Sequence, residues 1–158
     1  MEAMSAWFWL GIWTILLAGS IVAHEIGHVV AGLRCGWSYG GTFVRLRVSG
    51  VGVHLDPSTP EAEKRLWLVA LAGPLASAML AAIFWPLSVL PGQSGLVFTS
   101  LWMLNLVFVV ANLIPSPITD GGFIVQSIFG VRVSWRRFAL IVSALWVISE
   151  VIAAYFLI

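Results

Sequence analysis

Two histidines and a glutamate lie close together in an otherwise apolar segment near the start of the chain. Residues 24–28 read His-Glu-Ile-Gly-His, and no ionisable side chain occurs over residues 3–23. On a helix, His24 and His28 share one face and can both reach a metal ion, while Glu25 lies on an adjoining direction, suited to a water at that metal. This pattern is typical of a hydrolytic zinc site.

Catalytic zinc needs three protein ligands and one position open to water, so the two histidines are one ligand short. The candidates for the third ligand are His54, Asp56, Glu61, Glu63, Asp120 and Glu150. Asp120 is favoured because it follows a helix end broken by prolines, where Gly121 and Gly122 let the backbone turn its carboxylate inward. Glu150 is the next alternative. Its carboxylate lies within an apolar helix and could instead pair with Ser77 or Asn105.

The composition indicates that the solvent of this chain is a lipid bilayer. Of its 158 residues, 60% are hydrophobic and 9% are charged, and the mean hydropathy is +1.00. A water-soluble domain of this size would lack the polar surface to cover itself. A spanning helix needs about 20 apolar residues, and four segments qualify: 3–33, 66–90, 95–119 and 138–158. We expect an all-α polytopic membrane protein that forms one membrane-embedded domain over residues 1–158.

The placement of the charges predicts the orientation in the membrane. All eight basic residues lie in the connections after the first and third apolar segments, and the 91–94 connection has none. By the positive-inside rule, those two connections are cytoplasmic and both termini are outside. Tryptophans such as Trp7 and Trp135 lie where interfacial anchors are expected. We therefore expect an integral protein of a prokaryotic cell membrane, with residues 24–28 toward the cytoplasm.

The same charges indicate which partners to expect. Arg132, Arg136 and Arg137 follow the third apolar segment, where basic side chains meet the anionic headgroups of the bilayer. The net charge of +1 gives no reason to propose a nucleic-acid partner.

The segment 36–60 predicts short strands at the cytoplasmic membrane face. Partial two-residue alternation and β-branched residues over 42–55 indicate a β-hairpin that turns near residues 49–50. Its free edge could pair with an extended peptide, although a hairpin that only connects two helices fits equally well. A helix start follows, with Ser58 as the possible cap and Glu61 three residues later.

Three motifs in separate helices together resemble those of one protein family. They read Ala-His-Glu-Ile-Gly-His at 23–28, Ala-Gly-Pro at 72–74, and Asn-x-x-Pro-x-Pro-x-x-Asp-Gly at 112–121. The combination resembles the site-2 protease family of intramembrane zinc metalloproteases and covers most of the chain. The first motif is short and not specific alone, whereas the third motif two spans later makes the combination specific. The Ala-Gly-Pro motif could equally serve helix packing.

The resemblance implies the roles of the site residues. His24, His28 and Asp120 would bind Zn²⁺, Glu25 would act as the general base, and Asn112 with the hairpin would help to hold an unwound substrate. The reaction would be hydrolysis of peptide bonds near the cytoplasmic face, as in regulated intramembrane proteolysis. The substrate would be a single-span or tethered membrane protein, and a regulatory membrane partner is possible but not identified.

The chain departs from the family pattern in two ways. Thr119 replaces the leucine that many relatives have before Asp-Gly, and neither a PDZ nor a CBS domain is visible, so we expect a minimal form. A non-hydrolytic metal-binding membrane protein, either a transporter or a sensor, is the alternative function. It would need the three ligands but not the adjacent Glu25, whose presence favours the protease.

Overall fold

The computed structural model covers residues 1–158 and describes the backbone outside 1–5, 40–44, 48–49, 53–54 and 157–158. Side chains are described over 7–38, 55–145 and 147–148. Within these ranges the chain is mostly helical, as expected, and its strands are confined to the segment between the first two long helices.

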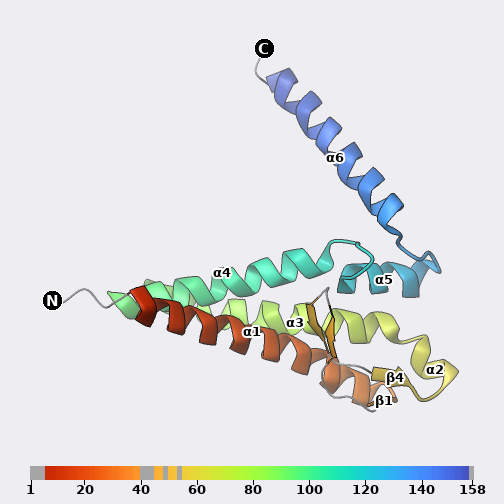
Figure 1. The fold of residues 1–158 in the computed structure, drawn as a ribbon, viewed down its shortest axis with the longest axis horizontal. Helices are drawn as coiled ribbons and strands as arrows, with labels where there is room; N and C mark the ends of the chain where they lie inside the picture. Colours follow the sequence, from red (N-terminus) through yellow and green to blue (C-terminus); the bar gives the residue numbers. More distant parts are fainter. Residues whose placement is uncertain (1–5, 40–44, 48–49, 53–54, 157–158) are drawn as a thin grey trace.

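Three long helices form a bundle: α1 (Ala6–Arg34), α3 (Leu66–Phe84) and α4 (Gln93–Leu113). α3 packs against both α1 and α4, and the three helices run side by side (Figure 1). The segments long and apolar enough to cross a bilayer are Trp7–Arg34, Leu66–Val89 and Gln93–Leu113. Three of the four expected spans are thus confirmed by length and composition.

The fourth expected span corresponds to α6 (Trp135–Phe156), which projects away from the bundle (Figure 1). Several of its side chains, including that of Glu150, lie outside the described part of the chain. A fourth span therefore stays a prediction, as does any partner of Glu150. The two candidate partners have other contacts, because Ser77 lies against His24 and Asn105 donates a hydrogen bond to Ser20.

The centre of the bundle is polar, and its large apolar side chains face outward. Ser20, His24, Ser77 and Asn105 are buried between the helices, whereas Leu, Ile and Val side chains of all three helices are exposed. This distribution suits a bilayer, where apolar surface is solvated by lipid and polar side chains join the helices. A Cβ at Gly27 of α1 would lie 2.5 Å from the carbonyl oxygen of Ala72, so small residues allow α1 and α3 to approach closely.

The chain enters the second long helix through a separate short helix, α2 (Pro60–Glu63). The Oγ1 atom of Thr59 accepts a hydrogen bond of 3.1 Å from the backbone N–H of Ala62, and Glu61 and Glu63 lie in the first turn. The expectation of a cap at Ser58 was wrong by one residue. The Thr59 hydroxyl satisfies an N–H group that has no partner within the helix. The negative charges of Glu61 and Glu63 interact favourably with the positive end of the helix dipole.

Prolines end the third long helix earlier than the expected boundary at residue 119. α4 ends at Leu113, and Pro115 and Pro117 follow, because proline lacks the N–H group and excludes the helical conformation of the residue before it. A further helix that the sequence analysis did not predict, α5 (Asp120–Phe129), then begins. Gly130 caps its carboxyl end, with a φ of 65° that is left-handed and favours glycine.

In the described part of the chain between α1 and α2, four short strands form two antiparallel pairs. β1 (Trp37–Tyr39) pairs with β4 (Leu55–Pro57), and β2 (Arg45–Arg47) pairs with β3 (Gly50–Gly52). In the β2–β3 pair, residue 47 lies opposite residue 50. This pairing confirms a hairpin near residues 49–50. Position 54, with its candidate ligand His54, lies outside the described residues.

Candidate metal centre

Three of the predicted ligands converge between α1 and the start of α5. The Nε2 atoms of His24 and His28 lie 3.2 Å apart. The Oδ2 atom of Asp120 lies 3.1 Å from Nε2 of His24, and Oδ1 lies 3.4 Å from Nε2 of His28. The tertiary fold therefore brings a carboxylate 96 residues away in sequence to the two imidazoles of one helix.

The histidine rings are oriented by α3, which lies behind them. Nδ1 of His28 lies 2.7 Å from the carbonyl oxygen of Val69, and Nδ1 of His24 lies 3.0 Å from Oγ of Ser77. A carbonyl oxygen only accepts, so Nδ1 of His28 carries the hydrogen and Nε2 of the neutral ring keeps its lone pair. Such outer contacts fix the tautomer and ring orientation of metal-binding histidines.

Gly73 lies between Val69 and Ser77 on the same face of α3, directly against the two imidazoles. A Cβ at this position would collide with Nε2 and Cε1 of His28, and it would lie 2.7 Å from Nε2 of His24. The absence of a side chain therefore makes room for both rings. The middle residue of the Ala-Gly-Pro motif contributes to the site by its small size, whereas Pro74 is buried within the helix.

Asp120 is held in place by the loop between α4 and α5. Oγ1 of Thr119 contacts Oγ of Ser116 at 3.0 Å and donates a hydrogen bond of 2.5 Å to the carbonyl oxygen of Ile114. The threonine that departs from the family pattern thus braces the loop beside the carboxylate.

The two glycines after Asp120 act differently from our expectation. Neither Gly121 nor Gly122 has a positive φ, and both lie in the first turn of α5. A Cβ at Gly121 would lie 2.8 Å from the carbonyl oxygen of Ile114, and one at Gly122 would collide with the carbonyl oxygen of Ser116. The glycines are needed because α5 packs closely on the preceding loop, not because the backbone makes an unusual turn.

The carboxyl group of Asp120 is mostly buried, with 14% of its side chain exposed. Burial disfavours the charged form, but contacts with the facing His24 and His28 side chains outweigh burial and lower the pKa of the carboxyl group. Asp120 is therefore a carboxylate, which is the form that binds a metal ion.

The geometry fits zinc. Tetrahedral zinc with bonds of about 2.0–2.1 Å places its ligand atoms roughly 3.3 Å apart, and the separations between the three side chains are 3.1, 3.2 and 3.4 Å. Glu25 lies beside this set, since its carboxylate and the two histidines offer ligand atoms within 4.8 Å of one another. The arrangement is two imidazoles and the carboxylate of Asp120, with the second carboxylate, that of Glu25, beside them.

The described residues among the other candidate site residues are exposed or half-buried. Asp56, Glu61 and Glu63 are exposed, as expected of surface carboxylates. Asn112 lies near the end of α4, is half-buried, and donates from Nδ2 to the carbonyl oxygen of Phe108 at 3.0 Å. Its role in substrate binding stays a prediction.

Sequence reasoning missed the residues that orient the histidines. Val69, Gly73 and Ser77 are spaced by four, which places them on one face of a helix. This spacing around the Ala-Gly-Pro motif is the signal that could have identified them, whereas the sequence analysis considered Ser77 only as a possible partner of Glu150.

Two curated relatives have similar sequences. A Mycobacterium tuberculosis protein named "Putative zinc metalloprotease Rip3" is 32% identical over an alignment of 137 residues, which covers 78% of this chain and 31% of the relative. A Synechocystis protein named "Putative zinc metalloprotease sll0528" is 34% identical over an alignment of 126 residues, which covers 75% of this chain and 32% of the relative. The chain thus spans about a third of the length of these relatives.

No family model and no solved structure matches the chain. The names of the two relatives and the geometry of His24, His28 and Asp120 nevertheless both indicate a zinc site. Over about three quarters of its length, the chain is similar in sequence to proteins named zinc metalloproteases, in agreement with its resemblance to the site-2 protease family.

Proposed function

We propose that the chain is an intramembrane zinc metalloprotease that hydrolyses peptide bonds of membrane-spanning or membrane-associated proteins near the cytoplasmic face. The observation that carries this proposal is the convergence of His24, His28 and Asp120 at separations of 3.1–3.4 Å, with Glu25 beside them. When bound, zinc supplies Lewis acidity toward a peptide carbonyl and lowers the pKa of water.

The side chains of the site have separate tasks in this proposal. His24, His28 and Asp120 hold the metal. Val69 and Ser77 of α3 fix the orientation of the two imidazole rings through their Nδ1 atoms. Glu25 takes a proton from the attacking water and passes it to the leaving amine, as a general base that becomes a general acid.

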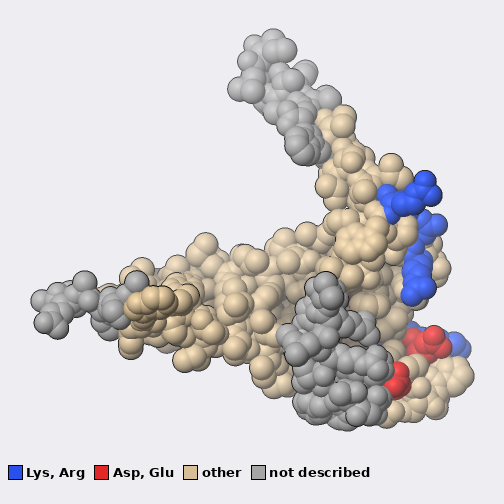
Figure 2. Space-filling view, in the orientation of Figure 1, with Lys and Arg blue, Asp and Glu red and all other residues tan. Residues whose placement is uncertain are grey.

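The position of the charges supports a site near the cytoplasmic face. On the face shown in Figure 2, the charged side chains that the structure describes gather at one end of the molecule, over α2 and the junction of α5 and α6. α5, which begins at Asp120, lies at the same end (Figure 1). By the positive-inside rule this end is cytoplasmic, and both termini are outside.

A substrate helix must unwind before its peptide bond is accessible, because a helical carbonyl is hydrogen-bonded within its own turn. The free edge of the β2–β3 pair offers backbone groups to an extended segment, and Asn112 offers an amide near the end of α4. The substrate class is therefore a single-span or tethered membrane protein with a segment that unwinds readily.

The test compares cleavage and zinc content in liposomes. Wild type, Glu25→Gln and the matched control Glu61→Gln, whose side chain is exposed, are incubated with a panel of tagged single-span proteins. We expect all three to retain zinc and only Glu25→Gln to lose cleavage, by about 100-fold or more, because a general base contributes about 10²–10⁴-fold.

Each other outcome contradicts part of the proposal. Cleavage by Glu25→Gln at the wild-type rate would exclude this residue as the base. Zinc retained by wild type without cleavage of any substrate would favour the metal-binding transporter or sensor.

A further inference from the structure

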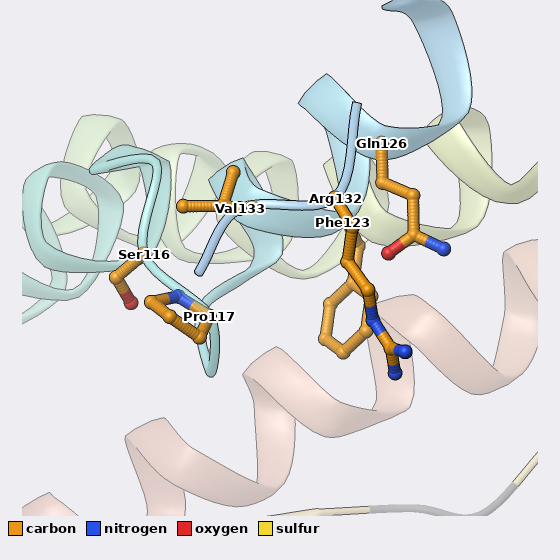
Figure 3. A pocket seen from close by; sticks show the side chains of 7 residues that line it. Ser116, Pro117, Phe123, Gln126, Arg132 and Val133 are labelled. Carbon is orange, nitrogen blue, oxygen red and sulfur yellow. The ribbon is translucent and has the colours of Figure 1, made fainter. Parts of the chain in front are cut away.

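A small cavity of about 170 Å³ lies beside the loop that positions Asp120. Its walls come from three segments (Figure 3): the loop before α5 with Ser116, α5 with Phe123 and Gln126, and the connection to α6 with Arg132. Ligand pockets for whole small molecules are typically about 300–1,000 Å³. The cavity therefore suits one compact chemical group rather than a complete metabolite.

The polar side chains of the cavity are suited to an anion. The side chains of Arg132 and Gln126 extend to the same side (Figure 3), and none of the described residues that line the cavity is acidic. Nη1 of Arg137 donates to the carbonyl oxygen of Arg132 at 2.9 Å, which keeps a second guanidinium nearby. A planar guanidinium beside an amide donor matches the oxygens of a phosphate group.

The surroundings of the cavity are those of a bilayer interface. Phe129 at the end of α5 is 70% exposed, and Trp135 at the start of α6 is 58% exposed. Ile128 and Val131 add further exposed apolar surface. Aromatic and apolar side chains that alternate with arginines are typical of the headgroup level, where basic pockets between helices bind anionic lipids.

We propose that this cavity binds the phosphate group of an anionic phospholipid, with Arg132 as its charged partner and Gln126 as a hydrogen-bond donor. The cavity shares Ser116 and Gly122 with the contact between α5 and the loop before it. A bound headgroup therefore braces the segment from which Asp120 extends. This lipid site does not depend on hydrolysis by the metal centre.

Native mass spectrometry of the full chain, released from detergent, tests the proposal. The protein is mixed with a phosphatidylglycerol or with a phosphatidylcholine of the same acyl length. We expect retention of phosphatidylglycerol in preference, with an apparent affinity about fivefold lower in Arg132→Gln, as expected for the loss of one basic residue near the headgroup. Arg136→Gln is the matched control, because Arg136 is exposed and does not line the cavity.

Two further arms make the result decisive. Gln126→Leu preserves every charge, and we expect it to weaken phosphatidylglycerol retention as well. Excess inorganic phosphate should not displace the lipid. Equal retention of both lipids, equal losses in Arg132→Gln and Arg136→Gln, or unchanged retention in Gln126→Leu would overturn the headgroup site. Displacement by inorganic phosphate would overturn the lipid assignment, because the cavity would then be a site for free anions.

Discussion

The substitution Gly73→Ala separates the requirements of the metal centre from those of the helix that carries it. In α3, alanine should be the better residue, because it favours a helix over glycine by about 1 kcal/mol. The added Cβ, however, would lie 2.7 Å from Nε2 of His24 and would collide with the ring of His28. Helix propensity and metal binding are therefore expected to change in opposite directions.

The magnitude follows from the required movement. To reach 3.4 Å, the lower limit of ordinary contact, the ring of His24 must move by about 0.7 Å, and that of His28 must move further. Zinc sites tolerate deviations of about 0.2 Å in ligand distance, and a misplacement of about 1 Å at a reacting centre costs about 100-fold. We expect zinc affinity to fall by about 100-fold or more, while the helical content is unchanged.

The assay is competition for zinc against a chelator in detergent, with circular dichroism as the measure of folding. Gly19→Ala is the matched control, because Gly19 lies in α1 and a Cβ there meets no atom within 4 Å. Wild-type zinc affinity in Gly73→Ala would refute the conclusion that both imidazoles rest on this glycine. An equal loss in Gly19→Ala would show that any added methyl group perturbs the bundle.

Three other substitutions test the rest of the site. Ser77→Ala removes the contact with Nδ1 of His24 and should weaken zinc binding by about 10–100-fold. The control Ser100→Ala loses only a contact within α4 and should bind zinc as wild type does. Equal zinc affinities of the two variants would count against the orienting role of Ser77. Asp120→Asn should lower zinc affinity by about 100-fold or more, and full zinc occupancy under chelator would argue against Asp120 as the third ligand. Gly122→Ala places a Cβ against the carbonyl oxygen of Ser116 and should destabilise the fold by about 1–3 kcal/mol, a loss that thermal unfolding in detergent would reveal.

The two histidines of the candidate metal centre could be predicted because their spacing and surroundings are local properties. His24 and His28 are four residues apart in a helix, and charged or titratable groups within an apolar span are costly without a function. Asp120 required a second motif, since nothing near residue 120 in the sequence indicates a contact with residue 24. The prolines at 115 and 117 indicated a break before Asp120, although the predicted boundary at residue 119 was wrong because α4 already ends at Leu113.

Other features depended on contacts between distant segments. The sequence predicted that Gly121 and Gly122 allow an unusual backbone turn, but they lie in an ordinary helix and are small because the preceding loop packs against them. α5 was not predicted, because its ten residues were treated as part of the connection between the third and fourth spans. The close approach of the loop to the two glycines has no signal in composition, because it depends on the packing of two segments.

The sequence by itself determined that this chain requires a bilayer, that its histidines share one helical face, and that a carboxylate follows a break at the end of a later helix. These properties depend on apolar length, on the 3.6-residue period and on the missing N–H group of proline. Only the tertiary structure decided that α3 lies behind the imidazoles, with Val69 and Ser77 fixing the rings and Gly73 making room for them. Contacts across α1, α3 and α5 depend on how the helices pack, and residue spacing along a single helix does not specify that packing.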